Sequence, residues 1–131
     1  MAIQSHLSIE TRKIEGFKAK KKPSHLFNWE KMKPILKRFL LLHIIQGITG
    51  HPQKHLSIYE LSTTINRNTT LKSQNREGIV KDQLGIYIEN LIYYGFIDES
   101  YSKGLVLNDK IYDELQKVDR IITGNIGEVE K

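Results

Sequence analysis

The sequence predicts a mainly helical α+β fold, with three or four helices and one two-strand β-hairpin. Apolar residues recur at three- and four-residue steps in several segments, as in amphipathic helices. Ser57 and Glu60 have the spacing of a helix N-terminal capping box. Two short apolar runs flank Gly104, as in a hairpin. One domain is expected, because 131 residues suit one hydrophobic core with short tails.

Charge is divided unevenly along the chain. The net charge is +5, yet residues 1–38 hold ten Lys or Arg against three acidic residues, and residues 82–131 hold five against ten. The basic end includes a run of lysines just before Pro23, and we expect residues 1–28 to form a basic, partly disordered arm. Such an arm suits a polyanion, usually nucleic acid, although a solvated tail has the same composition.

A long first helix is predicted over residues 29–49. Either Asn28 caps it, or the helix starts later with Pro34 in its first turn. Its second half is apolar on nearly every side, which indicates a helix central to the core or covered by a second subunit. Gly47 and Gly50 are expected to end it. Its basic residues are expected on the solvated face: Lys31, Lys33, Lys37 and Arg38.

A short second helix follows, with the sharpest local signal in the sequence at its start. In the capping box the Ser57 hydroxyl accepts a backbone N–H bond and Glu60 reaches back to the Ser57 amide. Leu56 and Leu61 flank the box as a hydrophobic staple. The helix is expected to end by Asn66 and to bury three residues: Ile58, Leu61 and Ile65.

A third helix is predicted over residues 79–94, closed by Gly95 with a positive φ. Its apolar stripe comprises Val80, Leu84, Tyr87, Ile88 and Leu91, with Ile92 at the edge. The outward face is expected to show Asp82, Gln83, Ile86, Glu89, Asn90 and Tyr93. Because Asp82 and Glu89 would repel the phosphates of a nucleic acid, we do not expect the whole helix to insert into the major groove of a duplex.

A hairpin and a last helix complete the chain. Strands over residues 96–100 and 105–107 are joined by a turn that ends at Gly104. Asn108 or Asp109 then caps a helix that runs through Ile122, followed by an acidic tail over residues 123–131. The apolar stripe of this helix either completes the core or forms an antiparallel dimer contact; it comprises Ile111, Leu115, Val118 and Ile122.

The order of these elements resembles the winged helix-turn-helix family of DNA-binding domains. The resemblance lies in a short capped helix (LSIYELSTTIN), a longer helix closed by glycine (IVKDQLGIYIENLIYYGFI) and a hairpin (DESYSKGLVL). It implies a winged-helix domain over residues 29–122 that binds double-stranded DNA, most often as a homodimeric transcriptional regulator or a factor of replication or partition. The sequence departs from the family at residues 67–78, because a helix-turn-helix normally turns in about three or four residues.

The expected DNA contacts lie in the arm, the long connection, the start of the third helix and the hairpin turn. Basic and amide side chains suit phosphate and base-edge hydrogen bonds, although an ordinary surface loop has a similar composition. Near the third helix only Lys81 and Gln83 are good groove readers. The full set is Lys20, Lys21, Lys22, Arg67, Lys72, Ser73, Gln74, Arg76, Lys81, Gln83 and Lys103.

A protein-interaction module is the competing interpretation. Winged helices also serve as adaptors, and Ile86 and Tyr93 on the outward face of the third helix suit a protein partner. Charge reversal at Lys72 and Arg76 would separate the two interpretations. Lost DNA affinity with intact folding would support DNA binding, and unchanged behaviour would support the protein-interaction module.

Other classes find little support in the sequence. Cysteine is absent, the longest apolar run is far shorter than the roughly 20 residues of a membrane span, and no signal peptide is recognised. A cytoplasmic protein without membrane partner is therefore expected. His51 and His55 flank Pro52 in a loop, so neither a metal site nor another cofactor is expected. No phosphate-binding glycine loop or nucleophile elbow is present, which predicts a protein that is not an enzyme.

Overall fold

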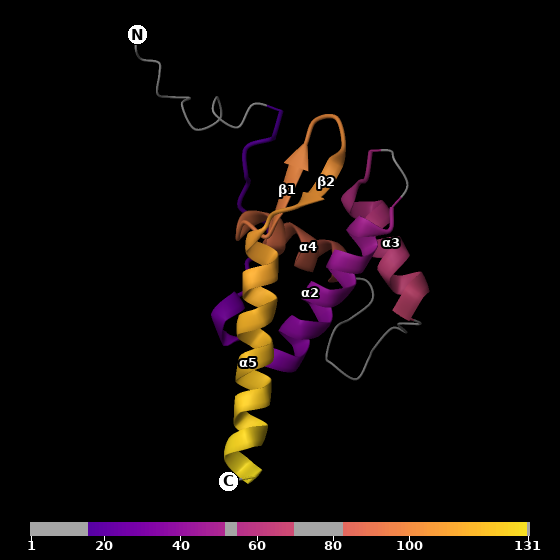
Figure 1. The fold of residues 1–131 in the computed structure, drawn as a ribbon. Helices are drawn as coiled ribbons and strands as arrows, with labels where there is room; N and C mark the ends of the chain where they lie inside the picture. Colours follow the sequence, from indigo (N-terminus) through magenta and orange to yellow (C-terminus); the bar gives the residue numbers. More distant parts are fainter. Residues whose placement is uncertain (1–15, 52–54, 70–82, 131) are drawn as a thin grey trace.

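The computed structural model describes residues 16–51, 55–69 and 83–130, and confirms a mainly helical fold with a two-strand antiparallel hairpin. In Figure 1 the helices surround the base of the hairpin, and the last helix extends away from it. The elements in order are the 3-10 turn η1 (Trp29–Lys31), α2 (Pro34–Thr49), α3 (Ile58–Thr69), α4 (Leu84–Tyr93), β1 (Ile97–Ser100), β2 (Gly104–Leu107) and α5 (Lys110–Glu130).

The α2 helix begins at Pro34, which is the later of the two predicted starts. Pro34 occupies the first turn, where its missing N–H costs no helical hydrogen bond. Trp29 lies outside α2, in η1, and the Asn28 side chain makes no capping hydrogen bond. The predicted helix over residues 29–49 is therefore a 3-10 turn followed by a shorter helix.

Two further predictions for α2 are wrong. Lys37 was expected on the solvated face but is only 5% exposed, with its Nζ 5.5 Å from the centroid of the Trp29 ring. A cation at that distance from an indole ring is attracted by the ring quadrupole. Gly47 was expected to end the helix but lies within it, and a Cβ there would stand 2.6 Å from Leu61 Cδ1. Gly47 therefore permits the close approach of α2 and α3.

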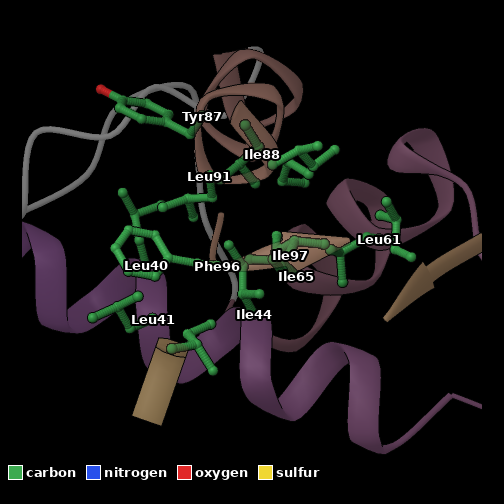
Figure 2. Packing of buried hydrophobic residues seen from close by; sticks show 14 of the residues in the cluster. Leu40, Leu41, Ile44, Leu61, Ile65, Tyr87, Ile88, Leu91, Phe96 and Ile97 are labelled. Atoms are coloured by element: carbon green, nitrogen blue, oxygen red, sulfur yellow. The ribbon is translucent and has the colours of Figure 1, made fainter. Parts of the chain in front are cut away.

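The core lies between α2, α3, α4, the hairpin and the first half of α5. Figure 2 shows side chains of α2 and α3 meeting those of α4 and β1 in one cluster. The most deeply buried members are Leu40, Leu41, Ile44, Leu61, Leu84, Ile88, Leu91, Ile97, Ile111 and Val118. Burying one large apolar side chain contributes about 1.5–3 kcal/mol of transfer free energy, and this burial is the main favourable contribution to folding.

The predicted capping box at the start of α3 is confirmed. The Glu60 N–H donates to Ser57 Oγ (3.1 Å), and the Ser57 N–H donates to Glu60 Oε1 (3.0 Å). Leu56 and Leu61 on either side of the box are both buried. The helix continues to Thr69, three residues beyond its predicted end at Asn66.

The predicted stripe of α4 is confirmed within the described residues, but its outward face differs from the prediction. Leu84, Ile88 and Leu91 are fully buried, and Gly95 has a φ of +95°. Asn90 was expected outside but is 3% exposed. The side chain is enclosed by the chain N-terminal to α2, a contact that helical periodicity cannot predict.

The hairpin pairs β1 with β2 from Ile97–Leu107 to Ser100–Gly104. Both of its outer edges are partly covered. Leu56 forms a parallel bridge with Gly104 on the β2 edge, and Phe17 forms an antiparallel bridge with Ser100 on the β1 edge. Covered edges do not offer their backbone groups to other chains.

The apolar stripe of α5 was predicted either to complete the core or to form an antiparallel dimer contact. Ile111 and Val118 are both 0% exposed in the core of this chain, while Leu115 and Ile122 pack against the core from its margin. Core packing is therefore confirmed, and Ile111 and Val118 cannot offer a surface to a second subunit. The helix continues to Glu130, so the backbone of residues 123–130 is helical where an acidic tail was predicted.

Among the described residues, none of the helices is both long enough and apolar enough to cross a membrane.

Candidate nucleic-acid interface

The tip of the hairpin carries exposed basic and aromatic side chains. Tyr101 is 64% exposed, Lys103 is exposed beside it, and Lys18 Nζ lies 5.9 Å from the centroid of the Tyr101 ring. The buried Ser100 fixes this turn, because its Oγ accepts from the N–H groups of Ser102 (3.2 Å) and Lys103 (3.1 Å). The hairpin therefore presents cationic groups from a turn with a defined backbone.

Gly104 joins the hairpin to the start of α3. Its φ is +76°, and a Cβ at this position would stand 2.1 Å from the Leu56 carbonyl oxygen. The Leu56 N–H donates to the Lys103 carbonyl (3.0 Å), and the Leu105 N–H donates to the Leu56 carbonyl (2.9 Å). Only glycine allows both this backbone conformation and this approach.

The opposite edge of the hairpin is covered by residues 16–28, which we name the N-terminal strap. The Lys18 N–H donates to the Glu99 carbonyl, and the Tyr101 N–H donates to the Gly16 carbonyl, both at 2.8 Å. Lys20 Nζ donates to Asp98 Oδ1 (2.7 Å) and to the Ile97 carbonyl (3.1 Å). In Figure 1 the strap, in indigo, runs beside β1 toward η1.

The second half of the strap is held by Asn90 of α4. Asn90 Nδ2 donates to the His25 carbonyl (2.8 Å) and to the Ile86 carbonyl (2.9 Å), while Oδ1 accepts from the Phe27 N–H (2.8 Å). The Tyr94 hydroxyl also donates to the Phe27 carbonyl. Both amide donors and the acceptor of Asn90 are therefore satisfied, and its side chain grips the backbone of the strap.

Aromatic stacking adds to this attachment. The Phe27 ring lies 4.7 Å from the Tyr87 ring in a stacked arrangement, and the His25 ring meets Phe27 edge-on at the same distance. Burial raises the pKa of Tyr87 above its ordinary value of 10.0. Figure 2 shows the Tyr87 hydroxyl at the margin of the core cluster, directed away from it.

The strap crosses α4 at its C-terminal half. Lys21, Lys22 and Pro23 line an open pocket of about 300 Å³ together with Glu89 and Ile92 of α4, while residues 25–27 contact the opposite flank at Asn90 and Tyr94. Ile86 and Gln83 lie toward the other end of the helix. The strap therefore covers part of the surface of α4.

The described members of the predicted contact set lie in separate places. Lys21 and Lys22 are exposed on the strap, and Lys103 is exposed at the hairpin turn. Arg67 and Gln83 are exposed at the end of α3 and just before α4. Since Arg67 stands nine residues after Ile58, the helical rise of about 1.5 Å per residue puts it about 14 Å along α3 from the end that meets the hairpin.

The remaining members lie outside the described residues: Lys72, Ser73, Gln74, Arg76 and Lys81. Of the described members, Lys20 is engaged by Asp98 within the chain. Sequence reasoning missed two residues of this region. Lys18 stood in the recognised lysine run but was not selected, and Asn90 was placed outside although a lone amide in the apolar segment ENLIYYGFI signals a buried polar contact.

A larger open pocket of about 490 Å³ lies where η1, the end of α4 and α5 meet. Trp29 and Phe96 are among its aromatic lining residues, and Trp29 Nε1 donates to Glu114 Oε2 at 2.7 Å. Its charged lining is balanced between Lys110, Lys117 and Arg120 on one side and Glu30, Asp113 and Glu114 on the other. Within the part of the chain that the structure describes, no cluster of three His, Asp or Glu suits a metal ion.

Comparison of the chain with protein-family models, with curated proteins and with solved structures finds no match.

Proposed function

We propose that this chain is a winged-helix DNA-binding protein that acts as a transcriptional regulator. The observation that carries the proposal is the bridge between Leu56 and Gly104, which joins the hairpin to the start of α3. The order along the chain is α2, the bridging residue Leu56, α3, α4 and then the hairpin. This order resembles the winged helix-turn-helix arrangement. In that arrangement α3 and α4 are the two helices of the motif, and β1 and β2 form the wing.

The proposed contacts are electrostatic and follow from charge and exposure. Lys103 at the wing, Lys21 and Lys22 on the strap, and Arg67 at the end of α3 are exposed cations suited to phosphate. Gln83, exposed just before α4, suits a base edge. Because the strap crosses the C-terminal half of α4, the proposed groove contact is confined to the start of that helix.

Fluorescence anisotropy of the full chain with a labelled DNA duplex, over a salt series, tests the proposal. Specific and non-specific phosphate contacts both release counterions, so the logarithm of the affinity should fall linearly with the logarithm of the salt concentration. Absence of binding at low salt would contradict the proposal.

A matched pair of charge reversals separates the wing from overall charge. Lys103→Glu is expected to weaken binding by roughly tenfold and to reduce the salt slope by about one phosphate contact. Lys117→Glu makes the same change of net charge on α5, where an exposed lysine lines the 490 Å³ pocket. Equal effects of the two variants would show that the wing makes no particular contact.

A protein-interaction role is the second candidate, favoured by the outward face of α4. Tyr93 is 37% exposed, Ile86 is half-buried, and Glu89 adds an acidic group near them. This face attracts a protein surface more readily than phosphate. Tyr93→Ala should leave DNA affinity unchanged in either case, so loss of a partner protein with intact DNA binding would support this candidate.

A further inference from the structure

The elements that the strap crosses, β1 and α4, carry acidic side chains. Asp98 and Glu99 lie on β1, and Glu89 lies on α4. Without the strap, these three carboxylates would repel a DNA backbone from the side of the wing and of α4. The docked strap opposes this negative charge, because it carries lysines.

The strap brings four lysines close to β1, α4 and the hairpin turn. Lys20 pairs with Asp98 at 2.7 Å. Lys21 and Lys22 line one pocket with Glu89 and Glu99. The fourth, Lys18, is attached to Glu99 through the backbone, and its Nζ lies 5.9 Å from the centroid of the Tyr101 ring. The strap therefore carries four lysines into a region where β1 and α4 carry three carboxylates, and Lys103 at the wing adds a further positive charge.

The strap is held through its backbone, which leaves most of its lysine side chains exposed. Asn90 binds the main chain at His25 and Phe27, and β1 binds the main chain at Gly16 and Lys18. Lys18, Lys21 and Lys22 are exposed at the surface. A long mobile tail would pay conformational entropy each time a lysine meets a phosphate, whereas a docked strap has already been ordered in the free protein.

We propose that the docked strap is a fixed part of a phosphate-binding face for double-stranded DNA, with Asn90 as its positioning residue. The face consists of Lys18, Lys21 and Lys22 on the strap and Lys103 on the wing. The proposal deepens the proposed function and rests on it. It differs from a basic tail in one respect, because the lysines act only when the strap is docked.

Two substitutions in a double-mutant cycle test this in the full chain. Asn90→Leu keeps the size of the side chain and the charge of the protein but removes all three of its hydrogen bonds. Lys21→Gln with Lys22→Gln removes two exposed cations without touching the docking contacts. DNA affinity and its salt slope are measured for the wild type, each variant and the combination, with amide hydrogen exchange of residues 16–28 as the readout of docking.

The expected result is that Asn90→Leu raises exchange in the strap, weakens DNA binding about tenfold and lowers the salt slope by about two phosphate contacts, although every lysine remains. In the Asn90→Leu background the two Lys→Gln changes should then have little further effect. Equal effects of Lys→Gln in both backgrounds would overturn the proposal in favour of a tail. Tighter binding by Asn90→Leu would also overturn it, since the strap would then be inhibitory.

The outcomes also separate this proposal from the proposed function. Failure of the wild type to bind duplex DNA contradicts the DNA-binding proposal itself. Binding by the wild type that is unaffected by Asn90→Leu, with the strap shown by exchange to be released, contradicts only the positioning role. If Asn90→Leu does not fold, Tyr94→Phe replaces it, because it removes only the hydroxyl bond to the Phe27 carbonyl.

Discussion

The two edges of the hairpin are covered in different ways, and the difference separates structure from function. On the β2 edge, Leu56 is 2% exposed, and its backbone approaches Gly104 so closely that no other residue fits there. On the other side, the strap is held by backbone hydrogen bonds along the β1 edge and, at α4, by one buried amide and one stacked ring. The first contact belongs to the core, while the second is a docking contact at the margin of the core, and we expect the rest of the core to persist when it is lost.

The largest effect is expected from Gly104→Ala on the β2 edge. The new Cβ would overlap the backbone of Leu56 and would also disfavour the positive φ. We expect a loss of about 3 kcal/mol or more in the free energy of unfolding, measured by denaturant titration.

Gly16→Ala is the matched control for this prediction. Gly16 has a φ of +89°, but a Cβ there meets nothing within 4 Å. Gly16→Ala should cost only the backbone strain of about 1–2 kcal/mol, and this strain should weaken the docking of the strap. Equal global destabilisation by the two variants would show that the approach of Leu56 is not the cause.

Asn90→Leu should have the next largest effect, and it acts where the strap docks on α4. The substitution leaves the Phe27 N–H and the His25 carbonyl without their partner, at a cost of about 1–3 kcal/mol. Because the strap can undock, we expect faster amide exchange over residues 16–28 with little change at Leu105. Loss of protection at both places together would contradict the separation of the two edges.

Ser57→Ala tests the structure that follows the Leu56 bridge. Loss of the Ser57 hydroxyl removes the reciprocal capping of α3 and should cost about 1 kcal/mol in a thermal or denaturant unfolding experiment. Ser62→Ala is the control on the same helix, because Ser62 Oγ bonds only to carbonyls of the preceding turn. A cost for Ser62→Ala as large as that for Ser57→Ala would contradict the capping explanation.

Asp98→Asn should have the smallest effect on stability. The Lys20–Asp98 pair is partly exposed, with 36% and 24% of the two side chains accessible, and pairs of this kind contribute about 1 kcal/mol or less. The substitution also removes a carboxylate near the proposed phosphate-binding face, so DNA affinity should rise, with the strap still docked as measured by amide exchange, while the free energy of unfolding barely changes. An unchanged or lower affinity would contradict the electrostatic part of the account.

The structural features that could be predicted from the sequence are those determined by residues close together in the chain. The capping box at Ser57, the turn at Gly104 and the positive φ of Gly95 depend on local chemistry, and the structure has all three. The described stripe of α4 also follows from its period. These features were sufficient to predict the mainly helical fold with its hairpin.

The sequence could not predict contacts between distant segments. Lys37 is buried beside Trp29, Gly47 lies against Leu61, and Asn90 holds residues that stand more than sixty positions earlier in the chain. Each of these side chains has an ordinary local interpretation, as a surface lysine, a helix-ending glycine or an exposed amide. The candidate interface was predicted as a set of cations, but the strap that arranges part of it was not.

The most direct test of the central claim is residue-resolved amide hydrogen exchange of the free full-length chain. We expect the Lys18 and Phe27 amides on the strap to be protected, but at a lower opening free energy than the Leu56 and Leu105 amides on the opposite edge. Exchange of the strap amides at the rate of an unstructured peptide would contradict a docked strap. Exchange of all four amides at one common free energy would contradict its independence from the core.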